Sequence, residues 1–401
     1  MIRHVPVLAE RISGLLAHEE TGTVVDCTLG DGGHSAAFLS RLGPEGRVVG
    51  LDRDTSALRI ASERLSGDPR FSCVHTTFAG LGSVEAARGA VGFLFDFGVS
   101  SRQLDEDDRG FTIRPGVRLD LRMDPEDPRD LRSVLTESDA DELARNLSDL
   151  ADVPRSRTVA RHLARVAGER ELTSDDLEAA LQEAFPRGMR DRPREMARLS
   201  MALRMLVNRE LEEIEVALPA AWELLAPGGR MAVLTYHSVE DRLAKRILRG
   251  LIGDDPDAPR DLYGNRPERT GEWVVRLERP DPSEVASNPR ARSAQLRVVA
   301  KRRGAALAGV LVALLVVGLV GSVMVGCVWR QTRHVELEKG MEQARTSERL
   351  LHDSLVQVRA AVDAQRQPSA VAERAASLGY RRPERQFRIP DPDTMPVGGR
   401  P

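Results

Sequence analysis

The chain has 401 residues, 41% of them hydrophobic, which is enough for more than one domain with a buried core. The formal net charge of -3 excludes a nucleic-acid-binding protein that works through overall basicity, so any surface for RNA must be local. The three cysteines, Cys27, Cys73 and Cys327, contain no C-x-x-C pair, which argues against a zinc site and a disulfide framework.

The first predicted element is an apolar strand that runs into a glycine-rich turn, V-V-D-C-T-L-G-D-G-G-H at residues 24–34. A second apolar run, 48–51, ends in Asp52. In a doubly wound sheet such glycines let the backbone approach a nucleotide-like ligand, and the acid binds ribose hydroxyls. The turn lacks the dinucleotide and P-loop spacings, so a ligand without pyrophosphate, such as S-adenosylmethionine, fits better. The alternative is a turn that needs glycine only for packing.

Two later strands are predicted at 92–95, before Asp96, and at 230–236, before His237. The segment between them is polar and has helical patterns near 131–147, 158–166 and 174–185. Helices of this total length between two strands of one sheet indicate an inserted domain rather than a crossover. A substrate-docking lid is the functional interpretation, and a passive stabilising insert is the alternative.

Residues 304–328 carry no charged side chain and are rich in Val, Leu, Gly and Ala. As a helix they would be roughly 37 Å long, enough to cross a hydrocarbon core of about 30 Å. The pattern predicts a transmembrane helix, with a buried core helix as the alternative. More basic residues precede this run than follow it, which places the N-terminal part in the cytoplasm by the positive-inside rule.

Beyond this run, heptad spacing predicts a coiled coil at 329–367, with a tail at 368–401. The seam alternates steps of four and three residues, contains one polar position and ends at Pro368; its members are Leu337, Met341, Ala344, Glu348, Leu351, Leu355, Val358 and Val362. We expect this seam to pair with another helix, and the alternative is a solvated stalk without a partner. The sequence does not indicate the oligomeric state.

Seven motifs in order resemble those of the bacterial ribosomal RNA small-subunit methyltransferase H family, also called MraW. They are HVPVL from His4, DCTLGDGGHS from Asp26, DFGVSS from Asp96, RGF from Arg109, DLRMDP from Asp120, HSVEDR from His237 and NPRARS from Asn288. Their order and spacing hold to about Ala300. Phe97, Tyr236 and Val239 depart from the family's usual Leu, Phe and Leu, and only the tyrosine hydroxyl adds a polar group.

The resemblance implies an α/β fold: a Rossmann-like class I S-adenosylmethionine-dependent methyltransferase with an inserted helical domain. The implied domains are a core at 1–104 and 205–300 and an insert at 105–204. The implied activity is methyl transfer to the N4 amine of a cytidine in the decoding region of 16S rRNA, within the small ribosomal subunit. Carried over by position, the residues that bind S-adenosylmethionine would be Gly32, Gly33, His34, Asp52, Phe78, Asp96 and Gln103.

Asp96 is also the predicted catalytic residue. The N4 amine of cytosine is a poor nucleophile, so the site must accept its hydrogens and hold the nitrogen in line with the methyl group. Asp96 ends the fourth strand, at the sheet edge where ligands bind in such folds. We expect it to accept from the amine or to orient the methyl donor, and the alternative is an acid that caps the following turn.

One further histidine and several arginines are candidates for contacts on the substrate side. His237 is expected to be a histidine with satisfied hydrogen bonds at a strand end, or a residue on the substrate side. Arginines that follow the family motifs are candidates for contacts with RNA phosphates; they are Arg118, Arg122, Arg290, Arg292 and Arg297.

The C-terminal part resembles a different group, the FtsL type of bitopic cell-division protein. The resemblance rests on the span 304–328, the heptads and the ending A-E-R-A-A-S-L-G-Y at 372–380. It implies a periplasmic coiled coil that pairs with an FtsB-like division partner, and a single-pass location in the bacterial inner membrane. The alternative function is therefore a membrane-anchored division scaffold in which the methyltransferase half acts on another substrate or is secondary.

Overall fold

The computed structural model describes residues 6–380 apart from 258, 260–261, 267 and 304–305; within helices, the side chains of residues 101, 306–315 and 317 are also outside the description. The chain divides into two compact units, Met1–Gly304 and Ala305–Pro401. Of the predicted features, His4 and Val5 of the first motif and residues 381–401 of the tail lie outside the described residues.

A seven-stranded sheet of order β3-β2-β1-β4-β5-β7-β6 forms the centre of the first unit. Strands β1 to β5 are parallel, β7 runs antiparallel between β5 and β6, and this confirms the predicted Rossmann-like α/β class. The strands are β1 Gly22–Asp26, β2 Gly46–Asp52, β3 Phe71–His75, β4 Ala90–Asp96, β5 Leu225–Thr235, β6 Gly271–Glu278 and β7 Gln295–Lys301.

The strand predicted at 230–236 begins earlier, at Leu225, and includes the turn-like Pro227-Gly228-Gly229. The pairing of β4 with β5 shifts register between Ala90 and Gly92. An irregularity of this kind lets glycine remain inside a strand, which the sequence pattern alone reads as a turn.

Apolar residues cover both faces of the sheet, as expected for parallel strands buried by helices. Successive residues of a strand point to opposite faces, so Val24 packs in the cluster with Ile12 and Phe38 while Val25 packs in the cluster on the other face. The helical elements of this domain are α1 Ala9–Leu16, α2 Gly33–Arg41, α3 Thr55–Leu65, η1 Phe78–Ser83, η2 Glu85–Ala87, α4 Ser101–Asp105, η3 Asp107–Arg109, α10 Glu210–Leu224, α11 Ser238–Leu251, α12 Pro282–Ser287 and η4 Pro289–Ser293.

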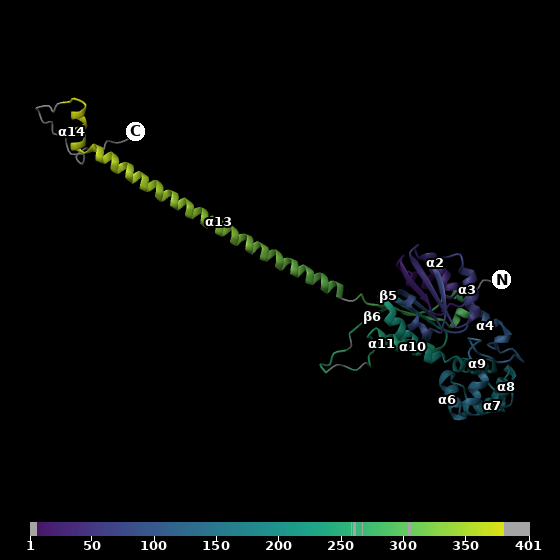
Figure 1. Cartoon of the computed structure of the whole chain (residues 1–401). Helices are drawn as coiled ribbons and strands as arrows, with labels where there is room; N and C mark the ends of the chain where they lie inside the picture. Colours follow the sequence, from purple (N-terminus) through teal and green to yellow (C-terminus); the bar gives the residue numbers. More distant parts are fainter. Residues whose placement is uncertain (1–5, 258, 260–261, 267, 304–305, 381–401) are drawn as a thin grey trace. The chain divides into compact units, whose positions relative to one another are not determined.

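Between β4 and β5 a group of helices has its own hydrophobic core, and Figure 1 shows α6, α7 and α8 gathered away from the sheet. These helices are α5 Leu131–Glu137, α6 Ala140–Ala151, α7 Ser156–Glu169, α8 Ser174–Ala184 and α9 Arg192–Asn208. The pattern predicted as one helix at 131–147 is two helices, because Asp139 caps the backbone of a new helix. Helix α9 also runs past residue 204, the predicted end of the insert.

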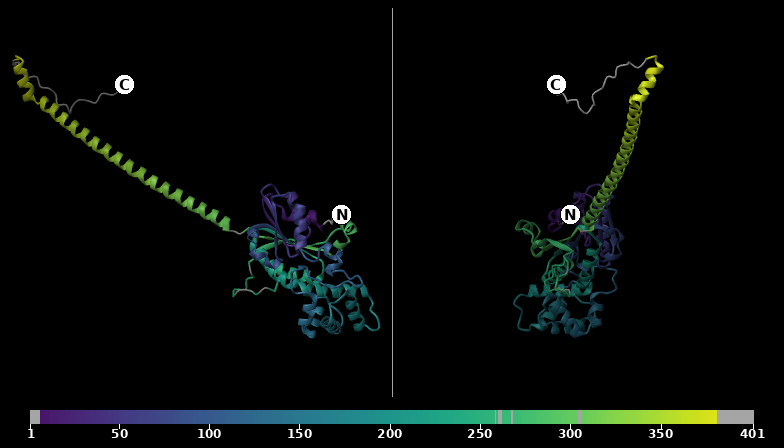
Figure 2. Two further views of the ribbon diagram at one scale, coloured as in Figure 1. Left: turned by 45° about the vertical axis from the view of Figure 1, so that its right-hand side comes forward. Right: turned by 90° about the vertical axis from the view of Figure 1, so that its left-hand side faces the viewer.

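The second unit consists of the long helix α13 Ala306–Arg366 and the short α14 Pro368–Ser377. Figure 2 shows α13 as one continuous helix in both views. All predicted heptad positions lie on α13 and are exposed, and this helix ends immediately before Gln367 and Pro368. The presence of a helix agrees with the prediction, while its pairing with another helix stays a prediction.

Within the described part of the chain, no helix combines the length and the apolar character that crossing a bilayer requires. The predicted transmembrane span 304–328 is therefore not supported by the structure. Residues 304–305 and the side chains of 306–315 and 317, which belong to that span, lie outside the described residues.

Candidate active site

The glycine-rich turn joins β1 to α2 and holds two glycines in the left-handed region. Gly30 has φ of 50° and Gly32, the N-cap of α2, has φ of 74°. A Cβ added to Gly32 would lie 3.2 Å from Leu65 Cδ1, so the residue is needed for backbone conformation and close packing of α3. Gly33 and His34 line a cavity of about 920 Å³, whereas Gly32 is not among its lining residues.

Asp52 closes β2 and ties that strand end to the turn. Its Oδ2 accepts from the backbone N–H of Gly30 at 2.8 Å, and its Oδ1 accepts from Asp54 at 2.9 Å. Burial raises the pKa of Asp52 to about 6, and the two backbone hydrogen bonds oppose this rise. A carboxylate has further lone pairs for ligand hydroxyls, so the predicted ribose-binding position is chemically suitable.

Phe78, predicted near the adenine, begins η1 and lines the cavity. Its ring lies 5.6 Å from that of Phe97 and 6.4 Å from that of Phe95, and the guanidinium of Arg53 lies 5.9 Å from its centroid. This aromatic group offers an apolar, polarisable surface of the kind that a planar base packs against.

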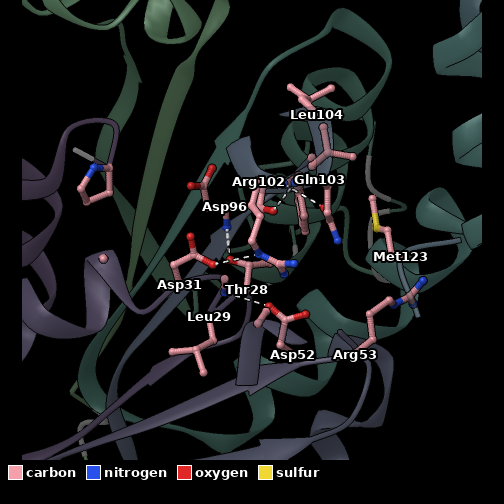
Figure 3. Close-up of a pocket in the computed structure, with 18 of the residues that line it drawn as sticks. Thr28, Leu29, Asp31, Asp52, Arg53, Asp96, Arg102, Gln103, Leu104 and Met123 are labelled. Atoms are coloured by element: carbon pink, nitrogen blue, oxygen red, sulfur yellow. Dashed lines mark hydrogen bonds and ion pairs between the residues drawn. The ribbon is translucent and has the colours of Figure 1, made fainter. Parts of the chain in front are cut away.

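Asp96 lies at the end of β4 and faces the turn from the neighbouring strand. Its backbone N–H donates to Thr28 Oγ1 at 2.7 Å, and its Oδ2 lies 3.6 Å from His34 Nε2. Asp96 Oδ1 and both ring nitrogens of His34 are buried without a hydrogen-bond partner among the described residues. Figure 3 shows Asp52 and Asp96, at the ends of β2 and β4, and Asp31, in the turn after β1, around one space. Buried acceptors without partners indicate a binding site for a polar ligand.

Gln103 follows β4 in the short helix α4, and its amide is engaged on both sides. Its Oε1 accepts from the Ser100 N–H at 2.9 Å, and its Nε2 donates to Asp54 Oδ2 at 3.1 Å. Gln103 lines the cavity. A contact with the methyl donor would use the remaining N–H of its amide, and this contact stays a prediction.

The sequence interpretation missed the residue that organises this side of the cavity, Asp54. It is 1% exposed and accepts from Arg102 at 3.2 Å and Arg109 at 2.9 Å. Burial raises the pKa of Asp54, but the charges of Arg109 and Arg102 outweigh it, so the net direction is down. Arg109 begins the RGF motif, to which the sequence assigned no role. Its ion pair with Asp54 in the folded structure indicates that the role is to hold this side of the cavity.

A second buried charged cluster lies where β5 meets α11 and the inserted helix α9. His237 Nε2 lies 2.7 Å from Glu240 Oε1, and Arg204 lies 3.6 Å from the same oxygen. Arg204 also donates to both oxygens of Glu210, at 2.7 and 2.9 Å. His237, Glu240 and Arg204 line the cavity. The expectation that the hydrogen bonds of His237 are satisfied is wrong, because both of its ring nitrogens are buried without a hydrogen-bond partner among the described residues.

The predicted RNA-facing arginines have different surroundings. Arg297 is 7% exposed and binds Asp241 with two nitrogens, at 2.8 and 2.9 Å, so its interpretation as a phosphate contact is wrong. Arg290 lines the cavity and pairs with Asp105 at 2.9 Å. Arg118 and Arg122 pair with Glu171 and Asp120.

Comparison with known proteins places this geometry in a family. Residues 1–302 match the MraW methylase family. Ribosomal RNA small subunit methyltransferase H of Heliobacterium modesticaldum is 39% identical over 315 residues, which cover 76% of this chain and 100% of the relative. The Chromohalobacter salexigens enzyme of the same name is 40% identical over 314 residues, 75% of this chain and 92% of the relative.

A solved structure of an rRNA methylase from Streptococcus thermophilus aligns over 75% of this chain and 99% of its own, with a TM-score of 0.34 and 15% identity. The fold is assigned from the order and direction of the strands given above, and not from this alignment. A glycine turn, the strand-end carboxylates Asp52 and Asp96, and an aromatic group line one cavity, and the family matches residues 1–302 of the chain. The chain therefore belongs to the MraW methylase family and is an S-adenosylmethionine-dependent methyltransferase.

Proposed function

We propose that this enzyme methylates the N4 amine of a cytidine in the decoding region of 16S rRNA, within the small ribosomal subunit. The observation that carries the proposal is Asp96 Oδ1, a buried acceptor without a partner among the described residues, at the edge of a cavity shared with the turn and Asp52. The relatives bear the name ribosomal RNA small subunit methyltransferase H, which supports rRNA as the substrate class.

The residues present fit S-adenosylmethionine, which supplies an activated methyl group on a positively charged sulfur. Asp52 offers carboxylate lone pairs for the ribose, Phe78 offers a surface for the adenine, and Gly33 and His34 line the turn at the start of α2. Gln103 and Asp96 complete the set that we assign to this ligand.

Asp96 performs the positioning step. The lone pair of a cytosine amine is delocalised into the ring, and an acceptor for one of its hydrogens fixes the orientation of the nitrogen. Asp96 Oδ1 has no hydrogen-bond partner among the described residues; the contacts with His34 and Thr28 use Oδ2 and the backbone N–H, and the Tyr236 hydroxyl interacts with the same carboxylate. We therefore assign Asp96 the role of hydrogen-bond acceptor for the N4 amine.

The test is methyl transfer from labelled donor to small ribosomal subunits that lack the modification, followed by nucleoside analysis of the 16S rRNA. We expect label in N4-methylcytidine at a single decoding-region position and none in naked DNA. Asp96→Asn should lower turnover by about 10²-fold or more, because an amide presents only one oxygen and a donor group in its place. Near-normal turnover of Asp96→Asn with unchanged donor affinity would refute the role of Asp96, and label in DNA would refute the substrate.

We also propose that the C-terminal unit is an FtsL-like division module, anchored in the inner membrane through 304–328, with a periplasmic C-terminus and an FtsB-like partner. The supporting observation is that α13 presents exposed apolar side chains along its length; among them are Leu319, Val320, Val323, Leu337, Leu351 and Leu355. The test is fractionation of cells that express the tagged chain. Recovery of the full chain in carbonate-washed membranes supports the module, and its recovery in the soluble fraction refutes it.

A further inference from the structure

The cluster at the end of β5 contains a histidine that the proposed role of Asp96 does not use. His237 is the N-cap residue of α11 and makes no side-chain capping hydrogen bond there. Its ring lies against Glu240, which is fully buried, and neither ring nitrogen has a hydrogen-bond partner among the described residues. A buried polar atom of this kind costs free energy unless it serves a ligand.

Glu240 determines which ring nitrogen of His237 carries the proton. Glu240 Oε1 lies 2.7 Å from Nε2 without hydrogen-bond geometry, and we assign the proton to Nε2 because the carboxylate charge attracts the N–H there, which leaves the lone pair on Nδ1. A carboxylate behind an imidazole also stabilises the imidazolium that forms when the second nitrogen takes a proton. Burial raises the pKa of Glu240, but the contact with the N–H of His237 and the charge of Arg204 outweigh burial, so the net direction is down and the carboxylate stays ionised.

The inserted helices hold this pair in place through Arg204. That guanidinium is supplied by α9, lies 3.6 Å from Glu240 and is bound at the other side by Glu210 of α10. The charged and titratable groups around the imidazole are therefore Glu240 on its own helix, Arg204 and Glu210 from α9 and α10, and Asp96, Tyr236 and Arg290 on the cavity wall.

His237 and Asp96 reach the same cavity from neighbouring parallel strands, β5 and β4. The amine of cytosine carries two hydrogens, and a monomethylated amine that returns to neutrality must lose one of them. One acceptor can hold the retained hydrogen while a second takes the departing proton. Asp96 and His237 both line the cavity and both have a side-chain acceptor without a partner among the described residues; His34 does too, but it lies on the glycine turn that we assign to the methyl donor.

We propose that His237 is the catalytic base of this enzyme, and that Glu240 and Arg204 are positioning residues for it; the inference rests on the proposed amine methylation. The amine nitrogen forms a bond to the methyl carbon as the carbon–sulfur bond breaks and its electron pair stays on sulfur. The nitrogen then releases one proton to Nδ1 of His237, and the imidazolium later passes it to water. Asp96 keeps the other N–H in place.

The experiment measures single-turnover methylation of small ribosomal subunits by the full chain, at saturating donor, across pH 5.5–9. The wild-type rate should fall on the acid side, because a protonated imidazole cannot accept. His237→Gln should lower the rate at neutral pH by about 10²-fold and remove this acid limb. Glu240→Gln should move the acid limb to lower pH by at least about one unit, because the charge that stabilises the imidazolium is lost.

A matched control lies in the inserted helices. His162 of α7 also pairs with a glutamate, since its Nδ1 lies 2.6 Å from Glu183 Oε2, but neither residue lines the cavity. His162→Gln makes the same chemical change and should leave the rate and its pH profile unaltered. Calorimetry should give the same donor affinity for wild type, His237→Gln and His162→Gln, which separates loss of the base from loss of binding.

A readout independent of turnover is the proton NMR titration of the imidazole C–H signals, in which the His237 signal is assigned by its absence from His237→Gln. Its midpoint should fall in Glu240→Gln and stay unchanged in His162→Gln. A His237→Gln variant that binds donor and keeps the wild-type rate and acid limb would overturn the assignment of the base while leaving amine methylation intact. A wild-type chain that transfers no label to the subunits would instead refute the proposed function itself.

Discussion

Three carboxylates near the strand ends differ in chemical state although the sequence presents each simply as an acid after an apolar run. Asp54 is buried and pairs with two guanidinium groups, so the pKa of its carboxyl lies below the ordinary value. Asp52 receives only backbone N–H groups, and burial raises its pKa to about 6. Asp96 retains an oxygen without a partner among the described residues. At the scale of the residue, the partner rather than the residue type determines the role.

The raised pKa of Asp52 predicts a pH-dependent affinity for the methyl donor. The ionised carboxylate accepts from ribose hydroxyls, so affinity should be constant above pH 7 and fall about tenfold per pH unit below pH 6. The folded-state pKa lies above the unfolded value, so the contribution of Asp52 to stability has the opposite trend: it is present at low pH and is lost as the pH rises through about 6. Calorimetric titration from pH 5 to 8 measures the affinity. Asp52→Asn should bind weakly with no pH dependence over this range, and a wild-type affinity that stays level to pH 5 would contradict the assignment.

At the scale of the element, the inserted helices are a separately packed group. Their cluster includes Leu143, Leu163, Leu181 and Leu199, all fully buried and all contributed by helices between β4 and β5. Polar ties to the sheet domain come from a few long-range contacts, among them that of Arg53, whose Nη1 donates to the carbonyl oxygen of Asn208 at 3.1 Å. A substitution in the core of the inserted helices can therefore lower the free energy of unfolding without moving the glycine turn that we assign to the methyl donor.

Leu163→Ala in α7 tests this separation. Removing a fully buried leucine should lower the free energy of unfolding by about 3 kcal/mol, from lost transfer energy and the remaining cavity. Donor affinity at 25 °C should be unchanged. Urea unfolding followed by circular dichroism gives the first quantity and calorimetry the second, with exposed Arg161→Ala as the matched surface control. An equal loss of donor affinity and stability would show that the inserted helices and the donor site behave as one body.

At the scale of the whole molecule, the sheet, the inserted helices and the cavity all belong to the unit Met1–Gly304, which also contains the residues matched by the family. The described part of the second unit consists of α13 and α14. The division-module proposal concerns only this second unit, so the two activities can be separated by truncation.

A chain that ends at residue 303 should retain the donor affinity and the rate of rRNA methylation of the full protein within about twofold, since the residues that line the cavity all belong to the first unit. Calorimetry and the labelled-subunit assay check both values against the full chain. A truncated protein that folds, as judged by circular dichroism, but no longer binds the donor would show that the second unit takes part in the site.

The sequence by itself determined the features that depend on local pattern. Alternating and continuous apolar runs predict β1, β2, β4 and β5, the glycines predict the turn before α2, and heptad spacing predicts a long helix, because each signal is contained in neighbouring residues. It did not reveal that Asp139 starts a new helix within 131–147 or that β5 contains Gly228 and Gly229. Asp139 can lie inside a helix or cap a new one, and Gly228-Gly229 can form a turn or lie in a strand. The surrounding tertiary structure decides between these conformations.

Only the tertiary structure decided which side chains act together. Arg297 follows the NPRARS motif and was expected to contact RNA phosphates, yet its side chain is buried against Asp241. Arg204 belongs to no recognised motif, and its side chain lies next to Glu240. Asp54 and Arg109 are likewise far apart in the chain and adjacent in space. The physical reason is that a charge is stabilised by whatever neighbour the fold brings within a few ångströms. Sequence spacing carries no information about that neighbour when the two residues lie on different elements.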